Sequence, residues 1–348
     1  MKIVKFMLIF IPISFIGKFL NFSPIIIFFL AALSIIPLAG IMGEGTEEIS
    51  FYTGPKIGGF LNATFGNATE LIISFFALKS GLFDVVKSSI AGSIIGNILL
   101  VLGASMFAGG LKHKIQKFNI NVVETTSSML LFALIGLCIP AFFTHTLSEN
   151  LLNTKYEGLS LIVAIVMFII YILSLVFSFF THKDLYAVSD VEEEGHSKWS
   201  LKKAISILVI STVIIAFESE FLVSGIEDIT SKLGLSEFFV GIIVIPIIGN
   251  AAEHSTAISM ALKNKMDVAI EIALGSSLQI ILFVAPILIF LSLLFEPMSI
   301  IFNPFELVAL IATVIIANKV ASDGQSNWLE GAQLMAVYFI IAAGFFIL

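Results

Sequence analysis

The sequence predicts an all-α, polytopic membrane protein with about eleven transmembrane helices, built from two inverted five-helix repeats. The first observation is composition: 58% of the 348 residues are hydrophobic and 12% are charged, whereas a soluble globular domain is about half apolar and a quarter charged. Second, apolar runs of about 20 residues, enough for a helix across a ~30 Å hydrocarbon core, recur throughout the chain. Third, a glycine–asparagine–glutamate motif occurs twice, inside two of these runs.

Eleven apolar segments are predicted to span the membrane, and they lack the period-two alternation of membrane β-barrel strands. The first segment could instead be a signal peptide, because Lys2 and Lys5 precede an apolar core. However, Ile16-Gly17-Lys18-Phe19 offers no small-x-small cleavage site. The predicted spans are residues 3–20, 22–42, 57–79, 84–109, 119–143, 157–181, 200–224, 237–262, 267–294, 301–318 and 328–347.

The distribution of lysine predicts the orientation. All 18 basic residues are lysine and the net charge is −7, so no basic patch indicates nucleic acid as a partner. With a cytoplasmic N-terminus, the inside loops hold thirteen lysines and the outside loops five, which agrees with the excess of positive charge on cytoplasmic loops. We therefore expect an integral protein of a prokaryotic-type cell membrane, with its N-terminus cytoplasmic and its C-terminus outside.

A polar segment divides the chain near its middle. The predicted organisation is an extra leading helix (1–20), a first repeat (21–181), an acidic cytoplasmic linker (182–199) and a second, inverted repeat (200–348). The linker is either a solvated connection or a cation-sensing segment. Its acidic residues are Asp184, Asp190, Glu192, Glu193 and Glu194.

The two halves share residues at a fixed separation, which we call the repeat shift. The separation of Gly66 from Gly249 is the same as that of Asp84 from Asp267 and of Gly92-Ser93 from Gly275-Ser276. Each repeat contains five predicted spans, and because five is odd the second copy must be inserted upside down. Inverted repeats whose broken helices meet at the bilayer midplane are typical of secondary transporters.

The repeated motifs are Gly66-Asn67-Ala68-Thr69-Glu70 and Gly249-Asn250-Ala251-Ala252-Glu253. An ionisable residue inside a membrane helix is costly and by default marks an ion or substrate path. On a helix, residues three and four apart share a face, so the glycine, asparagine and glutamate of each motif are predicted to lie together.

The inverted arrangement can bring Glu70 and Glu253 face to face. Two carboxylates in a low-dielectric cavity cannot both stay ionised without a cation or a proton, and their titration is coupled. Ca²⁺ suits such a pair because it takes about six to eight oxygen ligands. Asn67, Asn250 and backbone carbonyls can supply further oxygens; Pro246 tends to free one of these carbonyls, that of Ile242.

Further polar residues lie close to the motifs in sequence. Ser93, Asn97, Ser276 and Gln279 are predicted to support the site, whereas Gly92, Gly96 and Gly275 suit either the site or close helix packing. His254 could relay protons or hydrogen-bond a neighbouring helix. Three acids between the second and third spans could attract cations at an entrance or simply cap a hydrated helix end: Glu44, Glu47 and Glu48.

Together, the paired motifs resemble those of the calcium/proton exchangers, a branch of the calcium/cation antiporter superfamily. The resemblance covers nearly the whole chain and includes Lys263-Asn264-Lys265-Met266-Asp267, Gly275-Ser276-Ser277-Leu278-Gln279 and the stretch from Asp323 to Gly331. It implies a ten-helix inverted-repeat core, Ca²⁺ bound between the motif glutamates, and proton-driven alternating access. Such a protein is not an enzyme and needs no cofactor; its partners are Ca²⁺, H⁺ and the bilayer, with a homo-oligomer left open.

Three other functions are weighed against this one. A Na⁺-coupled calcium/cation exchanger would place further acids in the fourth and ninth spans, but residues 92–97 and 275–279 contain none. An intramembrane hydrolase would need a metal motif, and Glu253-His254 lacks the second histidine of a His-Glu-x-x-His site. A passive cation channel fits the charges, but not the inverted repeat.

Overall fold

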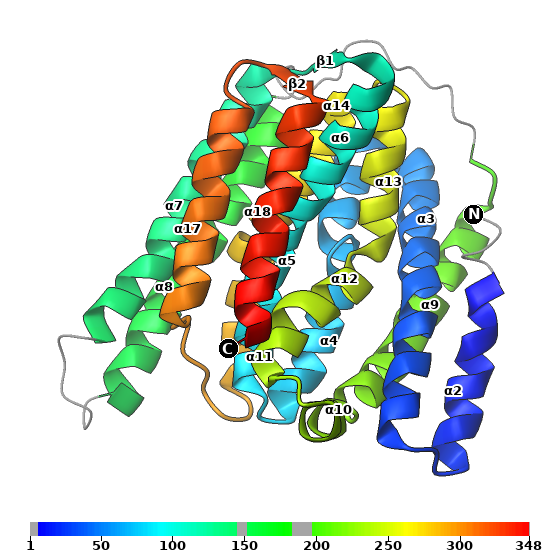
Figure 1. Cartoon of the computed structure of the whole chain (residues 1–348). Helices are drawn as coiled ribbons and strands as arrows, with labels where there is room; N and C mark the ends of the chain where they lie inside the picture. The colour runs from blue at the N-terminus through cyan, green and yellow to red at the C-terminus, as the bar shows by residue number, and fades with distance from the viewer. Residues whose placement is uncertain (1–5, 145–151, 183–196, 348) are drawn as a thin grey trace.

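The computed structural model describes residues 6–144, 152–182 and 197–347. This part of the chain forms a bundle of long helices with one small ribbon at its upper end in Figure 1, where strand β1 (Ile115–Lys117) pairs antiparallel with β2 (Gln325–Asn327). In the described ranges, seven helical spans are long and apolar enough to cross a membrane, and a bent pair makes an eighth. The all-α membrane fold is therefore confirmed.

The helices follow the order of the predicted spans. The N-terminal half contains a 3₁₀ turn η1 (Met7–Ile9), α2 (Phe10–Phe19), α3 (Pro24–Phe65), α4 (Ala68–Lys79), α5 (Phe83–Ile95), the π-helix η2 (Gly96–Val101), α6 (Leu102–His113), α7 (Ile120–Thr144), α8 (Leu152–Val176) and the π-helix η4 (Phe177–Thr181).

The C-terminal half is more interrupted, with three π-helical segments. It contains α9 (Leu201–Val223), α10 (Ile226–Leu233), α11 (Glu237–Phe239), η6 (Val240–Val244), α12 (Ile245–Gly249), α13 (Ala251–Leu262), α14 (Met266–Ile270), η7 (Glu271–Gly275), α15 (Ser276–Gln279), η8 (Ile280–Val284), α16 (Ala285–Ser292), α17 (Pro304–Val320) and α18 (Trp328–Ile347).

All eleven predicted spans fall on helical segments of the described chain, but the predicted gap between the second and third spans, residues 43–56, is mostly helical. Helix α3 (Pro24–Phe65) consists of two helices that meet inside this gap. It kinks at Gly54, whose φ of 81° is open to glycine because it lacks a Cβ. The helix finally breaks at Asn67 (φ −103°, ψ 17°), inside the first motif.

The second motif breaks its helix in the same way. Asn250 has φ −91° and ψ 5°, and the chain bends by 60° between α12 and α13. After the breaks, both ends of α4 are related to those of α13 by the repeat shift, and the π-helices η2 and η8 also fall at corresponding positions. The sequence repeat is therefore accompanied by a repeat of local structure, including its irregular parts.

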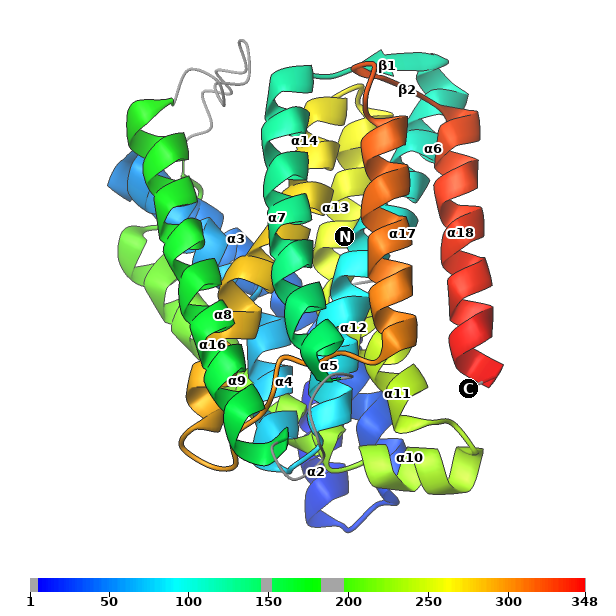
Figure 2. The same ribbon diagram turned by 90° about the vertical axis from the view of Figure 1, so that its left-hand side faces the viewer.

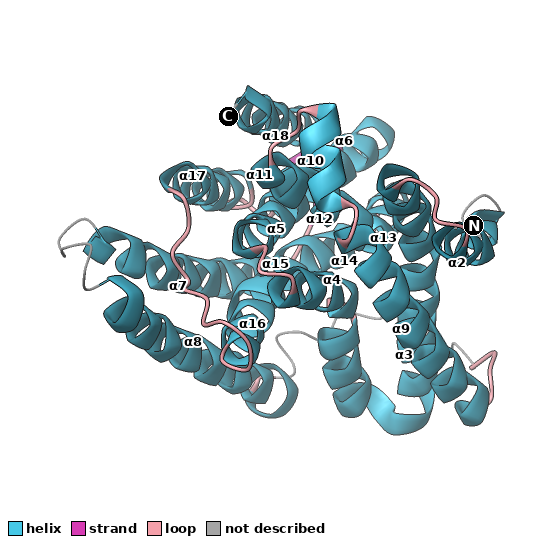
Figure 3. Ribbon diagram, turned by 90° about the horizontal axis from the view of Figure 1, so that it is seen from below, coloured by secondary structure: helices cyan, strands magenta, loops and turns pink. Residues whose placement is uncertain are grey.

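The elements that carry the motifs lie at the centre of the bundle. Seen from below, α4, α5, α12 and α15 are surrounded by the other helices (Figure 3). Helix α5 and the π-helix that continues it are almost wholly buried, for example at Ile94, Ile98 and Leu99. Helices α2, α3 and α9 group on one side, and α7, α8 and α17 lie on the other (Figures 1 and 2).

The upper end of Figure 1 is held by hydrogen bonds between the two halves. Gln116 Nε2 donates to Ala261 O at 2.9 Å and to Asn264 Oδ1 at 3.0 Å. The backbone N–H of Asn119 donates to Asp267 Oδ1 at 2.6 Å. These bonds attach the ribbon to the turn between α13 and α14, the end that the lysine distribution predicts to be cytoplasmic. The acids of the predicted linker, residues 184–194, lie outside the described residues.

Candidate ion-binding site

The helix breaks set the position of the two motif glutamates. Because the chain breaks at Asn67 and Asn250, Glu70 and Glu253 fall in the first turns of α4 and α13. The helix face that the residue spacing predicts is therefore interrupted at each asparagine. The first turn of a helix has free N–H groups and a partial positive charge that favours an anion. Both carboxylates thus sit where the backbone stabilises negative charge.

Each glutamate packs on the glycine of the other motif. A Cβ added at Gly249 would lie 2.8 Å from Glu70 Oε1, and one added at Gly66 would lie 3.5 Å from Glu253 Oε1. The two breaks therefore cross in the middle of the bundle, with the carboxylates facing the crossing point. A side chain at Gly249 would press on Glu70, whereas one at Gly66 would reach Glu253 only at ordinary contact distance and would press on Asn62 O, at 2.6 Å.

Hydrogen bonds connect the motifs to the flanking helices. Ser276 Oγ donates to Asn67 Oδ1 at 3.0 Å, and Asn250 Nδ2 donates to Ser93 Oγ at 3.3 Å. The two residue pairs are related by the repeat shift, since Ser93 corresponds to Ser276 and Asn67 to Asn250, although the serine donates in one bond and the asparagine in the other. The same pair of residue types therefore joins the two halves twice.

The two halves of the site are not identical. Asn97 Nδ2 donates to Ser276 Oγ at 3.1 Å, and Asn67 Nδ2 donates to Gln279 Oε1 at 2.5 Å. The residues at the corresponding positions in the other half are Ile280 and Gly96, which cannot make such bonds. All the predicted supporting polar side chains come together, but both extra amides lie on the Asn67–Ser276 side.

Several oxygens at the crossing point have no partner. Glu70 Oε2, Glu253 Oε2 and Asn250 Oδ1 are buried atoms that make no hydrogen bond within the described ranges. Buried polar atoms are nearly always satisfied, so these three oxygens are available to a cation or a proton. Carboxylate and amide oxygens are the ligands that Ca²⁺ prefers. No cluster of three acidic, histidine or cysteine side chains suited to a metal occurs in this part of the chain.

Solvent reaches the glutamate pair unevenly. Glu70 is 4% exposed and its neighbour Asn67 is fully buried, whereas Glu253 is half-buried. His254, the next residue, is also half-buried, and its Nε2 makes no hydrogen bond to any described residue. The alternative of a hydrogen bond to a neighbouring helix is therefore not seen at Nε2, and proton relay by His254 stays a prediction.

The glycines of the flanking helices separate into two kinds. A Cβ at Gly92 would lie only 2.0 Å from the carbonyl oxygen of Ile242, the carbonyl that Pro246 was predicted to free. Gly96 and Gly275, in contrast, would meet no heavy atom of the described residues within 4 Å. Close helix packing therefore explains Gly92 but not the other two.

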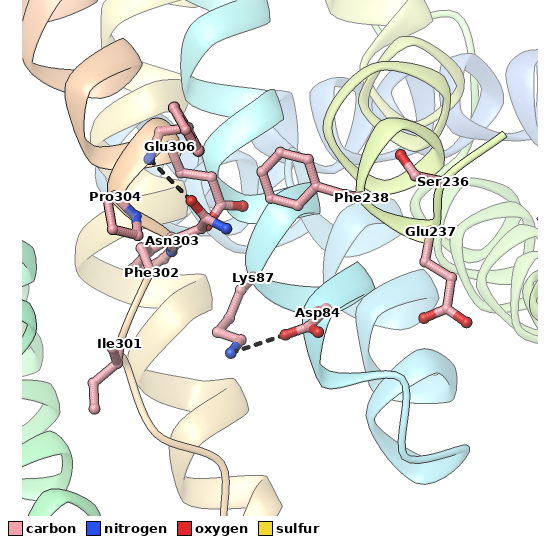
Figure 4. Close-up of a pocket in the computed structure, with 11 residues that line it drawn as sticks. Asp84, Lys87, Ser236, Glu237, Phe238, Ile301, Phe302, Asn303, Pro304 and Glu306 are labelled. Carbon is pink, nitrogen blue, oxygen red and sulfur yellow. Dashed lines mark hydrogen bonds and ion pairs between the residues drawn. The ribbon is translucent and has the colours of Figure 1, made fainter. Parts of the chain in front are cut away.

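A pocket of about 650 Å³ lies at the lower end of the bundle, apart from the glutamate pair (Figure 4). Asp84 and Lys87 form an ion pair of 3.1 Å in it. Glu306 forms a capping box with Asn303, whose N–H donates to Glu306 Oε2 at 2.8 Å. Glu306 thus lies in the first turn of α17, where its carboxylate caps the helix.

Two carboxylates in the spans were missed by motif-based reasoning. Glu218 is fully buried, and Ser14 Oγ donates to its Oε1 at 2.5 Å. Glu271 lies in the ninth predicted span, four residues before Gly275, and is exposed. It lies outside residues 275–279, the stretch in which the sequence analysis found no acid. A search for every ionisable residue inside an apolar run would have found both.

Comparison with known proteins identifies the family. Residues 23–180 and 203–347 match the family model described as sodium/calcium exchanger protein. The chain belongs to this exchanger family. It is 48% identical over 355 residues to the Ca(2+)/H(+) antiporter of Aphanothece halophytica, a match that covers 98% of this chain and 95% of that protein. It is 45% identical over 343 residues to the Ca(2+)/H(+) antiporter ChaA of Bacillus subtilis (strain 168), with 97% of each covered.

Solved structures agree with this membership. The exchanger-family chain matches the structure of native YfkE with a TM-score of 0.85 at 42% identity, covering 97% of each chain. The crystal structure of the H⁺/Ca²⁺ exchanger CAX has a TM-score of 0.77 at 14% identity, which shows a shared fold alone. With its apolar helices, this exchanger is an integral membrane protein.

Proposed function

We propose that this protein is a secondary active antiporter that exchanges Ca²⁺ for H⁺ by alternating access at the Glu70–Glu253 pair. The observation that carries the proposal is the reciprocal packing of Glu70 on Gly249 and of Glu253 on Gly66. It places two carboxylates from opposite halves of the chain at one point inside the bundle. Relatives at 45–48% identity that bear the name Ca(2+)/H(+) antiporter support the choice of ions.

The chemistry of exchange follows from the charge of the pair. When both carboxylates are ionised they repel each other, and a divalent cation between them removes that cost. Protons do the same by neutralising the acids, so the two kinds of ion compete for one site. The free oxygens of Glu70, Glu253 and Asn250 are the atoms available to a bound cation, and Asn67 is held beside them by Ser276 and Gln279. The ions cross chemically unchanged, so no enzymatic step or cofactor is involved.

Alternating access requires that the crossing point open to one side at a time. The half-buried state of Glu253, beside a buried Glu70, supports access from the Glu253 side. The helix breaks at Asn67 and Asn250 are sites where the chain can pivot without losing regular hydrogen bonds along a whole helix. Broken helices of this kind are common at the midplane of secondary transporters.

The test uses purified protein in liposomes, with Ca²⁺ uptake followed under an imposed pH gradient. Wild-type protein should show uptake driven by the gradient, and Glu70→Gln and Glu253→Gln should each abolish it. The amide keeps the size of the side chain but can neither carry the proton nor supply the anionic charge. Glu227→Gln, on the exposed face of α10, is the matched control. Near-normal uptake by either site variant at equal expression would refute the proposal.

A further inference from the structure

The two sides of the crossing point are packed differently. On one side, α5 lies tightly against η6: a Cβ at Gly241 would lie 1.9 Å from Ser88 Oγ, and a Cβ at Gly92 would lie 2.0 Å from Ile242 O. Ser88 is fully buried in this contact. The contact leaves no space for a side chain between α5 and η6 at Gly241 or at Gly92.

The equivalent contact in the other half is not made. The repeat shift places Glu271 at the position of Ser88 and Gly275 at the position of Gly92. Glu271 is exposed, and Gly275 meets no heavy atom of the described chain within 4 Å. The site is therefore open on the side of η7, near the turn that joins α13 to α14.

The residue that corresponds to Gly241 in the other half packs on its own helix instead of on η7. Gly58 corresponds to Gly241 under the same shift, but it packs on its own helix α3. A Cβ at Gly58 would lie 2.3 Å from Ser50 Cβ, on the other side of the kink at Gly54. Closure on this side thus requires the segment after Gly54 to exchange its contact with Ser50 for one with η7.

Glu271 lies on the same side of its span as two residues near the site. It lies four residues before Gly275 and eight before Gln279, so the three share a face. Gln279 accepts a hydrogen bond from Asn67 in the site, so this face leads from the opening to the glutamate pair. A carboxylate on the lipid side at this depth would be costly, whereas one beside an aqueous opening keeps its hydration.

We infer that Glu271 is a further proton-binding residue of the exchanger, which takes up a proton each time the open side closes. The inference rests on the proposed alternating access. Closure that mirrors the packed side would place Glu271 against Gly58, as Ser88 now lies against Gly241. A hydroxyl is buried there at low cost, but an ionised carboxylate is not. The proton returns to the same side on reopening, so it gates the cycle without changing the number of ions exchanged.

Charged groups of both signs lie on the elements around Glu271. Asp267 lies one turn earlier, on α14, and an ionised Asp267 carries the same charge as an ionised Glu271. The other titratable or charged groups on elements around η7 are Lys263 and Lys265 in the preceding turn, Glu253 and His254 on α13, and Glu124 on α7; the described residues of η2 and α15 carry none.

Exchange of Ca²⁺ for labelled Ca²⁺ across the membrane tests the inference. In this self-exchange the protein changes access in both directions with Ca²⁺ bound, so it needs no proton at Glu70 or Glu253. At saturating Ca²⁺, wild-type self-exchange should fall as the pH is raised from about 7 to about 9, by up to tenfold per unit. Glu271→Gln and Glu271→Ser, the latter restoring the residue type of Ser88, should exchange at a rate that no longer depends on pH. Glu124→Gln, an exposed acid on α7, should keep the wild-type profile.

The outcomes separate this inference from the proposed function. A wild-type rate that is flat from about pH 7 to about pH 9, with self-exchange intact, would overturn the role of Glu271 and leave the antiporter proposal standing. The same falling profile in wild type and both Glu271 variants would do so too. Absence of Ca²⁺ self-exchange in the wild type would overturn both. Thermal melting of each variant confirms that a lost rate is not lost folding.

Discussion

Replacing Gly249 by alanine tests the geometry of the site without removing a charge. The new Cβ would lie 2.8 Å from Glu70 Oε1, 3.2 Å from Cδ and 3.3 Å from Cγ. An ordinary contact begins at about 3.4 Å, so Oε1 must move by about 0.6 Å (3.4 less 2.8). Because a displacement of ~1 Å at a reacting or binding group costs up to ~100-fold, we expect Ca²⁺ affinity to fall by about tenfold to a hundredfold. This corresponds to about 1.4 to 2.8 kcal/mol.

The assay is calorimetric titration of Ca²⁺ into purified protein, with uptake in liposomes as the functional measure. Gly344→Ala is the matched control, since Gly344 lies in α18 and its Cβ would meet nothing within 4 Å among the described residues. It should bind Ca²⁺ as the wild type does and be slightly more stable, because alanine favours a helix over glycine by ~1 kcal/mol. Unchanged affinity in Gly249→Ala would refute the packing of Glu70 on this glycine as a determinant of the site.

Three further predictions follow from the proposed exchange. Lower pH should weaken Ca²⁺ binding, because protonation removes the charge that holds the cation; the same Ca²⁺ affinity at about pH 8 and about pH 5.5 would mean that the two ions use separate sites. Gradients of Na⁺, with pH clamped by an ionophore, should drive no Ca²⁺ flux, whereas robust flux would favour the Na⁺-coupled alternative. Neutralising Glu192, Glu193 and Glu194 together should leave maximal exchange intact, because exposed charges act over a Debye length of only ~8 Å; a correctly inserted but inactive triple variant at saturating Ca²⁺ would contradict this.

Much of the fold could be predicted because the length of each apolar segment and the fixed separation of the two repeats can both be read from the sequence. Hydropathy located the eleven helical segments, and the repeat shift related Asn67 to Asn250 and Ser93 to Ser276 before their hydrogen bonds were known. The structure then brought these side chains together. Their role in transport stays a prediction, because geometry alone does not measure flux.

Other features were not accessible from the sequence. Helix α3 stays helical through most of residues 43–56, where it packs against α9. No local sequence pattern predicts this packing. The breaks at Asn67 and Asn250 depend on the crossing of two chains far apart in sequence. The open side at Gly275 could not be predicted either, because two inverted copies of one sequence pattern do not indicate which half makes the close helix contact.

The reciprocal contact between glycine and glutamate also constrains how this chain can evolve. A side chain added at Gly249 would press on Glu70 of the other half, and one added at Gly66 would contact Glu253 of the other half, so a change at either glycine alters the surroundings of a glutamate in the opposite half. After an ancestral duplication, the two copies could diverge freely on their outer faces but not at these four positions. Descendants should therefore show paired substitutions across the halves, and a half transplanted from a distant relative should function only together with its matching partner.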